Sequence, residues 1–183
     1  MGGGDDGAQA GAVRLRPLLR EDAARIHEWA SQPTACRFQP WGPNSPAETE
    51  VFVDGAVAAW EQGPQMRWVW AAAAADTVVG IGEVQRKEVD AAEISYAVHI
   101  DLWGRGIATC IGRLLVAWAL ENLDVGRITA TCDPRNVASE HVLRGLGMQL
   151  ERTESHSLML RDGWRDSYVF SLARREWSAR MEE

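Results

Sequence analysis

The segment from Glu93 to Cys132 constrains the fold more strongly than any other part of the chain. Its residue pattern predicts a strand over Glu93–Ile100, a long helix over Gly106–Asn122 and a second strand over Arg127–Cys132. A strand, a helix and a strand in this order imply parallel pairing across a right-handed crossover. The chain is therefore expected to build a sheet that contains a parallel strand pair.

Two turns follow the predicted parallel strands and should lie close together. They are Ile100–Ala108, which leads into the long helix, and Asp133–Ser139, which leads into the next helix. Sheets of this kind bind ligands beyond the carboxyl ends of their strands. Both turns are therefore expected at one cleft.

The rest of the chain predicts an α+β domain with a mixed sheet. Further strands are expected at Val13–Arg16, Met66–Ala74, Thr77–Gln85, Gln149–Leu160 and Trp164–Leu172. Further helices are expected at Glu21–Ser31, Pro46–Glu61 and Asn136–Leu146, with a loop over Thr34–Pro46. Residues 13–183 fit a single domain, and residues 1–12 are expected to form a disordered tail.

Charge and cysteine content narrow the classes of function. Lys and Arg total 19 and Asp and Glu total 26, which gives a net charge of −7. This negative charge disfavours non-specific nucleic-acid binding and mildly favours a cationic substrate. A need for solubility alone would also account for the charge. No apolar run approaches the roughly 20 residues of a membrane span. Cys36, Cys110 and Cys132 form no metal-binding pattern, and their odd number favours a reducing compartment, so a cytoplasmic protein without a metal is expected.

The turn Gly104–Ala108 is a predicted anion site. Glycine lacks the Cβ that would block a diphosphate, and the first N–H groups of the following helix are free at its positive end. The turn lacks the third glycine and the acidic residue of a dinucleotide-binding fold, and the chain has no Gly-Lys-Ser/Thr motif. The anion is therefore expected to belong to a carried cofactor.

A second motif, Asp133–Ser139, opens the following helix. Helix capping accounts for Asp133 and Asn136 at its start and Gly147 at its end. Capping does not require Asn136 and Ser139 together at the mouth of the same cleft. A ligand-binding role is therefore the second interpretation of the motif.

With these two motifs in this order and spacing, the chain resembles the GNAT superfamily of acyl-CoA-dependent N-acetyltransferases, and most closely its RimJ/RimL-like branch. The resembling segments are AEISYAVHIDLWGRGIA, DPRNVASEHVLRGLGMQLE, RLRPLLREDAARIHEWA and PWGPNSPAETEVF. They span roughly Val13–Leu172. The superfamily has Arg or Gln where this chain has Trp103, but an aromatic residue is common there in the RimJ/RimL-like branch.

The resemblance implies a GNAT-like twisted, mostly antiparallel sheet with flanking helices, whose splayed parallel strand pair holds the pantetheine of acetyl-CoA. The cofactor diphosphate would lie on the turn that begins at Gly104, on the amides of Arg105, Gly106, Ile107, Ala108 and Thr109. The pantetheine arm would pair like an added strand with the backbone of Val98, His99 and Ile100. Asn136 would hydrogen-bond this arm, and Ser139 would lie near the sulfur.

The implied reaction is attack of a neutral amine on the thioester. At pH 7, deprotonation costs about 1 kcal/mol for an α-amine and about 4.6 kcal/mol for a lysine, so a general base is more pressing for lysine. Glu93 is the first candidate, because a glutamate in a similar Ala-Glu-Ile context is the base in the histone-acetylating branch. A structural carboxylate paired with an arginine is the alternative, and Glu83 on the neighbouring strand is the second candidate.

The other candidate groups surround the thioester. Ser139 is the candidate for protonating or steadying the leaving thiolate, with helix capping as its alternative. A strand amide near Val98–His99 is expected to stabilise the oxyanion. The His99 side chain is expected to be solvated or hydrogen-bonded, and Tyr96, on an apolar face, is expected in the core.

Two functions follow from these residues. The first is an N-acetyltransferase that acts on a primary amine, which could be a protein N-terminus, a polyamine or an amine-bearing small molecule such as an antibiotic. The second is a non-catalytic acyl-CoA-binding or sensing domain, which the presence of Glu93 and Ser139 makes less favourable. No nucleic acid or membrane partner is expected, and the protein is expected to be a monomer or a homodimer.

Overall fold

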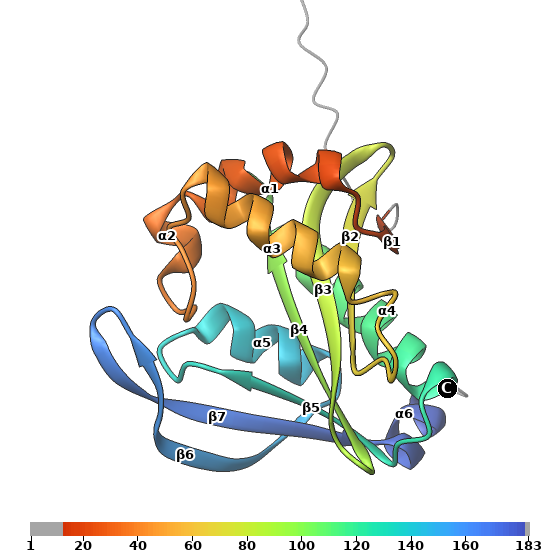
Figure 1. Cartoon of the computed structure of the whole chain (residues 1–183). Coiled ribbons are helices and arrows are strands. Elements are labelled where there is room, and N and C mark those ends of the chain that lie inside the picture. Colours follow the sequence, from red (N-terminus) through yellow and green to blue (C-terminus); the bar gives the residue numbers. More distant parts are fainter. Residues whose placement is uncertain (1–12, 182–183) are drawn as a thin grey trace, which may run out of the picture.

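A seven-stranded mixed sheet forms the centre of the computed structural model, which describes residues 13–181 (Figure 1). The strands lie in the order β1-β2-β3-β4-β5-β7-β6. Their bounds are β1 Val13–Pro17, β2 Arg67–Ala74, β3 Thr77–Glu88, β4 Ala91–Val98, β5 Arg127–Cys132, β6 Gln149–Leu160 and β7 Gly163–Ala173. All neighbours are antiparallel except β4 and β5, which are parallel as predicted. The predicted tail, residues 1–12, lies outside the described residues.

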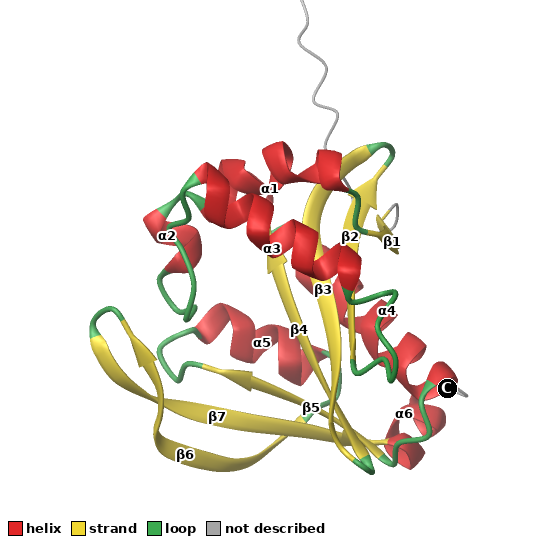
Figure 2. Ribbon diagram, in the orientation of Figure 1, coloured by secondary structure: helices red, strands yellow, loops and turns green. Residues whose placement is uncertain are grey.

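Helices pack on both faces of this sheet (Figure 2). They are α1 Ala23–Ala30, α2 Pro33–Cys36, α3 Pro46–Ala58, α4 Ile107–Asn122, α5 Val137–Gly145 and α6 Arg174–Met181, with short 3₁₀ turns η2 Arg20–Asp22 and η3 Ile100–Leu102. The apolar side of α4 packs against β4, where Ile111 and Leu115 join Ile94 in one buried cluster. On the opposite face, Val53 of α3 and Val69 of β2 belong to a second buried cluster. The predicted α+β fold is thereby confirmed.

The parallel strands β4 and β5 pair over only three residues each. The paired positions are Ala91 with Arg127, Ala92 with Ile128, and Glu93 with Thr129. Beyond these positions β4 continues to Val98 and β5 to Cys132, but the two strands no longer pair with each other. The two strands therefore splay apart, as Figure 1 shows, and this is the opening that the sequence resemblance implied.

Local hydrogen bonds set the helix boundaries. At the start of α3, the Ser45 hydroxyl accepts from the Glu48 amide (3.3 Å) and the Glu48 carboxylate accepts from the Ser45 amide (2.7 Å), which is a capping box. The prediction that this helix continues to Glu61 is wrong. It ends at Ala58, and Trp60 turns back so that its indole N–H donates to the carbonyl of Val69 (3.0 Å).

Three other predicted boundaries shift. β3 continues to Glu88 and does not end at Gln85, because its pairing with β4 extends through a bulge. The expected loop over Thr34–Pro46 contains part of the short helix α2. β4 ends at Val98, because the His99 side chain caps the η3 turn by accepting from the Asp101 amide (3.2 Å).

Candidate active site

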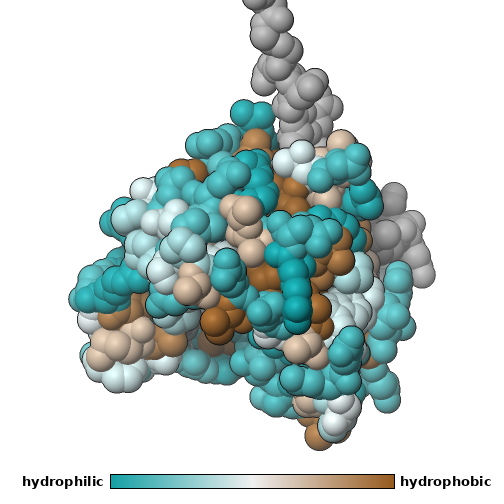
Figure 3. All heavy atoms as spheres, turned by 45° about the horizontal axis from the view of Figure 1, so that its top comes forward, coloured by the Kyte–Doolittle hydropathy of each residue, from teal (hydrophilic) through white to brown (hydrophobic). Residues whose placement is uncertain are grey.

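A cavity of about 700 Å³ opens where β4 and β5 diverge. Its walls come from the segment 38–44, α3, the middle of β3 and β4, the end of β5, the start of α5 and the β6–β7 hairpin. Figure 3 turns the top of the molecule forward and shows apolar residues near the middle of that face, framed by hydrophilic ones. The predicted cleft is thus present, with a largely apolar wall and a few polar groups inside it.

Strand alternation divides the polar groups of β4 between the two faces of the sheet. Tyr96 points to the face covered by α4 and α5, where it packs against the first buried cluster. Glu93 and Ser95 point to the other face, because Ser95 pairs with Glu83 and Glu83 pairs with Val69 of the second cluster. The cavity reaches both sides because no strand among residues 13–181 fills the gap between β4 and β5 beyond Glu93.

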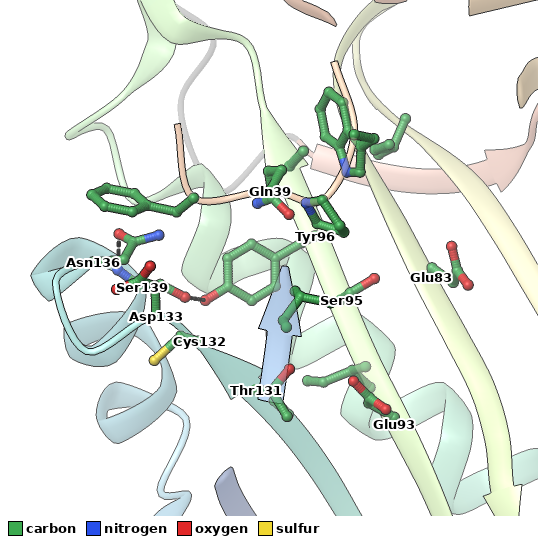
Figure 4. Close-up of a pocket in the computed structure, with 18 of the residues that line it drawn as sticks. Gln39, Glu83, Glu93, Ser95, Tyr96, Thr131, Cys132, Asp133, Asn136 and Ser139 are labelled. Atoms are coloured by element: carbon green, nitrogen blue, oxygen red, sulfur yellow. Dashed lines mark hydrogen bonds between the residues drawn. The ribbon is translucent and has the colours of Figure 1, made fainter. Parts of the chain in front are cut away.

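Tyr96 and Ser139 meet across the gap. The Tyr96 hydroxyl lies 3.3 Å from the Ser139 hydroxyl, and either group can donate the hydrogen bond (Figure 4). Burial raises the pKa of Tyr96 to about 12, so the phenol is neutral at ordinary pH. The prediction that Tyr96 belongs to the core is confirmed for its ring, which packs against the first buried cluster, while its hydroxyl reaches Ser139 in the cavity wall.

Asn136 caps α5 and also faces the cavity. Its side-chain oxygen accepts from the Ser139 amide (3.1 Å), so the capping interpretation of this motif holds. This bond uses the oxygen of the amide and leaves its NH₂ group as a donor on the cavity wall. Capping and ligand binding are therefore compatible at this residue.

The turn before α5 is fixed by a buried carboxylate. Asp133 accepts from the Arg135 amide (2.8 Å) and from its guanidinium (2.7 Å), and Arg135 also donates to Asp162 (2.7 Å). Burial alone would raise the pKa of Asp133, but the hydrogen bonds from Arg135 outweigh it and hold that pKa below its usual range. Asn136 and Ser139 thus project from a well-anchored turn.

The two candidate bases both line the cavity, and both have cationic neighbours. Glu83 receives two hydrogen bonds from the guanidinium of Arg67, at 2.8 and 2.9 Å. Glu93 lies 3.5 Å from the ammonium of Lys87, a longer and looser contact. In Figure 4 these carboxylates lie to one side of the Tyr96 ring and Ser139 to the other. Glu93 is therefore the less engaged of the two carboxylates.

The start of α4 has the geometry of an anion site. Gly104 and Gly106 both have positive φ angles, +77° and +75°, which favour glycine. The first amide bonded within the helix is that of Cys110, to the Gly106 carbonyl (3.1 Å). Among the described residues, no side chain caps this start, so the amides of the first turn are open to a ligand.

Some backbone hydrogen-bonding groups at the end of β4 already have partners within the protein. The His99 amide donates to the Val79 carbonyl of β3 (2.9 Å), so it is directed away from the gap. The prediction that the His99 amide could stabilise the oxyanion is therefore wrong. Backbone hydrogen-bonding groups of successive residues in a strand point to opposite sides, so those of Val98 and Tyr96 point toward the gap. The Val98 carbonyl accepts from the Trp103 indole (2.9 Å).

The His99 side chain is hydrogen-bonded, one of the two predicted outcomes. It is buried, and its Nδ1 accepts from the Asp101 amide, which places its proton on Nε2 facing Glu28 at 3.4 Å. The ring also packs edge-on against Trp29. These contacts give His99 a structural role next to the cavity.

Comparison with known proteins identifies the family. The family model of the acetyltransferase (GNAT) domain matches residues 12–149, most of the chain. The chain belongs to this family. Membership confirms the predicted class of enzyme, an acetyl-CoA-dependent N-acetyltransferase.

Individual relatives are distant. The chain is 25% identical over 171 residues to the uncharacterized N-acetyltransferase p20 of Bacillus licheniformis, which covers 91% of this chain and 95% of p20. A match to the uncharacterized N-acetyltransferase YnaD of Bacillus subtilis, 24% identical, spans 47% of this chain and 51% of YnaD. These relatives agree with the family and do not name an acceptor.

Solved structures share the fold. RimL, the ribosomal L7/L12 alpha-N-protein acetyltransferase, superposes with a TM-score of 0.78 at 20% identity, covering 88% of this chain and 90% of RimL. Spermidine N-acetyltransferase from Vibrio cholerae, solved with CoA and spermine, has a TM-score of 0.78 at 15% identity, covering 92% and 99%. At these identities the two likenesses show a shared fold.

The described residues contain neither a cluster of potential metal ligands nor a helix suited to crossing a membrane. Within residues 13–181, no group of three or more His, Cys, Asp or Glu side chains is arranged to hold a metal ion. In the same range, none of the helices combines the length and the apolar character that crossing a bilayer requires.

Proposed function

We propose that this acetyltransferase transfers the acetyl group of acetyl-CoA to a primary amine inside the cavity between β4 and β5. The observation that carries the proposal is the abrupt end of pairing between β4 and β5 at Glu93 and Thr129, which opens the sheet where polar groups from both faces line the cavity. A thioester inserted in this gap would meet Ser139 on one side and the amine on the other.

Acetyl-CoA would be held mainly by backbone groups. The open amides at the start of α4, from Arg105 to Thr109, would bind the diphosphate, with Gly104 and Gly106 giving it room. The pantetheine arm would pair with β4 through Val98, whose backbone faces the gap, and would extend past Ile100. The NH₂ group of Asn136 would donate to a carbonyl of this arm.

The reaction would need one proton acceptor and one proton donor. Glu93 would take a proton from the ammonium, directly or through water, and the neutral nitrogen would then attack the carbonyl carbon of the thioester. The Val98 amide would stabilise the oxyanion. As the C–S bond breaks, the Ser139 hydroxyl would protonate the thiolate while Tyr96, a neutral phenol, orients that hydroxyl. The nitrogen, now an amide, would lose its second proton, and water in the cavity would relay it back to Ser139.

Glu83 is the second candidate for the base, and its ion pair counts against it. A carboxylate that accepts two hydrogen bonds from a guanidinium has both oxygens engaged, which leaves it less free to approach an amine. We therefore assign Glu83 to holding Arg67 and the adjoining wall of the cavity. Glu93 remains the first choice.

The fold does not select the acceptor. RimL acts on a ribosomal protein and the Vibrio cholerae enzyme on spermidine, although both have the same TM-score to this chain. We propose a primary amine as the acceptor class, in a monomer or homodimer of the cytoplasm. The free state of Cys36, Cys110 and Cys132 supports a reducing compartment.

The experiment is thiol release from acetyl-CoA across a panel of primary amines, with Glu93→Gln as the test variant. Glu93→Gln should lower kcat about 10- to 100-fold, most strongly below neutral pH, where more of the amine is protonated. Glu83→Gln is the matched control, a nearby carboxylate changed in the same way. An unchanged pH–rate profile in Glu93→Gln would remove Glu93 as base, and cofactor binding without thiol release on any amine would favour a non-catalytic acyl-CoA-binding domain.

A further inference from the structure

Arg165 is a buried cation in the cavity wall with almost no partners. It lies near the start of β7, is 8% exposed, and lines the cavity. Its Nε is buried and has no hydrogen-bond partner within residues 13–181. Its Nη1 makes one long contact, 3.4 Å, with the carbonyl of Asp166. Most of the five N–H donors of this guanidinium are therefore left for something that occupies the cavity.

The surrounding charges do not neutralise Arg165. In the described part of the chain, no carboxylate oxygen lies within 4.0 Å of its guanidinium. Asp133 is the carboxylate whose charge acts most strongly on Arg165, but its oxygens already accept hydrogen bonds from Arg135 at 2.7 to 3.2 Å. Burial accordingly lowers the pKa of Arg165. A buried and unpaired charge is costly, and folded proteins seldom keep one without a ligand or ion to meet it.

The hairpin holds this side chain in place. Leu158 of β6 pairs with Arg165, and Glu154 pairs with Ser167, so β6 carries extra residues opposite Asp166 and bulges outward. The bulge is fixed by the His156 amide, which donates to Asp166 (2.9 Å), and by a hydrogen bond of 2.6 Å between Ser157 and Ser167. Bulges of this kind re-aim a neighbouring side chain.

Arg165 faces the amine side of the gap. Alternation along β7 places it with Ser167 and Val169, and Val169 pairs with Thr131 of β5. Thr131 shares its face with Thr129, which pairs with Glu93. Arg165 therefore shares a face of the sheet with the proposed base, away from the face that α4 and α5 cover. It lies on β7 beyond the last residue of β5 that pairs with this strand, whereas the proposed diphosphate site follows β4.

We propose that Arg165 binds a carboxylate carried by the amine acceptor. A carboxylate matches the planar fork of one guanidinium, whereas the double charge of a phosphate would be repelled by nearby Asp133. The acceptor would then be zwitterionic, with its amine toward Glu93 and its acid toward Arg165, as in an amino acid or an acidic peptide. This inference rests on the proposed amine acetylation and names the class of its acceptor.

The first test uses the wild-type enzyme and matched acceptors. Each of three acids is compared with its primary amide: L-leucine, L-phenylalanine and 4-aminobutyrate, whose carboxylate lies on the γ-carbon counted from the amine. For every compound, kcat/KM is expressed per concentration of the neutral amine, so that differences in amine pKa do not affect the comparison. The acid should be preferred by about 10- to 100-fold in at least one pair, the range for a hydrogen bond to a charged group. Equal rates for acid and amide in every pair that reacts would overturn the inference while leaving amine acetylation intact.

The second test uses variants and binding. Arg165→Met should bring the acid-to-amide ratio close to one, and Arg165→Lys should keep part of it. Arg152→Met, which removes an exposed arginine of β6 outside the cavity wall, is the matched control and should keep the wild-type ratio.

Binding separates this inference from the proposed reaction. In the wild-type protein, N-acetyl-L-leucine should raise the melting temperature more than N-acetyl-L-leucinamide does, and the difference should vanish in Arg165→Met. If neither acid nor amide releases thiol but this difference is present, the acetylation proposal fails and the carboxylate site stands. If the acid and the amide shift the melting temperature equally, the carboxylate site is overturned.

Discussion

The helices α4 and α5 both follow a strand of the splayed pair, yet their first turns are built in opposite ways. α4 begins at Gly106 in a left-handed conformation and has no side-chain cap among the described residues. α5 begins at Asn136, whose side chain accepts from the Ser139 amide (3.1 Å). The first helix offers backbone amides to a ligand, whereas the second uses a backbone amide internally and offers side chains.

This difference assigns separate tasks to the two turns. A row of backbone amides can bind an anion whatever the local side chains are, so it suits the invariant diphosphate of a cofactor. Side chains such as Ser139 can exchange protons, which backbone amides do not do readily, so they suit chemistry. Substitution of Ser139 should therefore act mainly on kcat, and substitutions in the first turn of α4 mainly on the KM for acetyl-CoA.

The largest expected effect is at Ser139. Ser139→Ala removes the hydroxyl that Tyr96 meets at 3.3 Å and should lower kcat about 100-fold, while the KM for acetyl-CoA changes little. Steady-state kinetics with varied acetyl-CoA separate the two parameters. Tyr96→Phe is the companion variant and should have a smaller effect in the same direction. A Ser139→Ala enzyme with normal kcat would show that α5 contributes no chemistry.

The second effect is at Gly106, on the other helix. Gly106→Ala places a Cβ at a φ of +75°, which costs roughly 1–2 kcal/mol and obstructs the first-turn amides. The KM for acetyl-CoA should rise about 10- to 100-fold, with kcat at saturation nearly unchanged. Gly147→Ala, at a φ of +88° beyond the end of α5, controls for strain alone and should leave this KM unchanged.

Much of this arrangement was predictable from the sequence, because it depends on local patterns. The spacing of apolar residues predicted β5 at Arg127–Cys132 without error and α4 to within one residue. Glycines at 104 and 106 predicted an uncapped turn, and Asn136 a cap. Each of these signals is confined to a few neighbouring residues, so no knowledge of distant contacts was needed.

The remainder depended on contacts between distant segments. The alternation of β4 placed Tyr96 on an apolar face, and only the position of α5 shows that its hydroxyl emerges beside Ser139, 43 residues away. The burial of Arg165 could not be predicted, because it depends on how the hairpin packs beside the bulge that β6 forms opposite Asp166. The inward alternation of Arg165, Ser167 and Val169 after the Asp162-Gly163 turn was the one local signal available.

The third effect tests whether Asn136 has two tasks. Asn136→Ala removes the cap of α5 and should destabilise the protein by about 1 kcal/mol, the usual cost of losing an N-cap. It should also raise the KM for acetyl-CoA about 3- to 10-fold, because a donor on the cavity wall is lost. Ser45→Ala removes the cap of α3 and is the matched control: a similar loss of stability, measured by urea denaturation, should leave KM unchanged. Equal KM values in the two variants would reduce Asn136 to a cap.

The smallest effect is expected at Arg105, and it sharpens the comparison most. Arg105 is the one charged side chain in the Gly104–Ala108 turn, and it is exposed. If the diphosphate is held by backbone amides, Arg105→Ala should raise the KM for acetyl-CoA by no more than about threefold at 0.15 M salt, since an exposed ion pair contributes roughly 0–1 kcal/mol. The measurement is the KM at low and high salt, because a side-chain contribution would grow as salt is removed. A tenfold or larger rise at both salt concentrations would mean that α4, like α5, binds through a side chain, and the division of tasks between the two helices would then be lost.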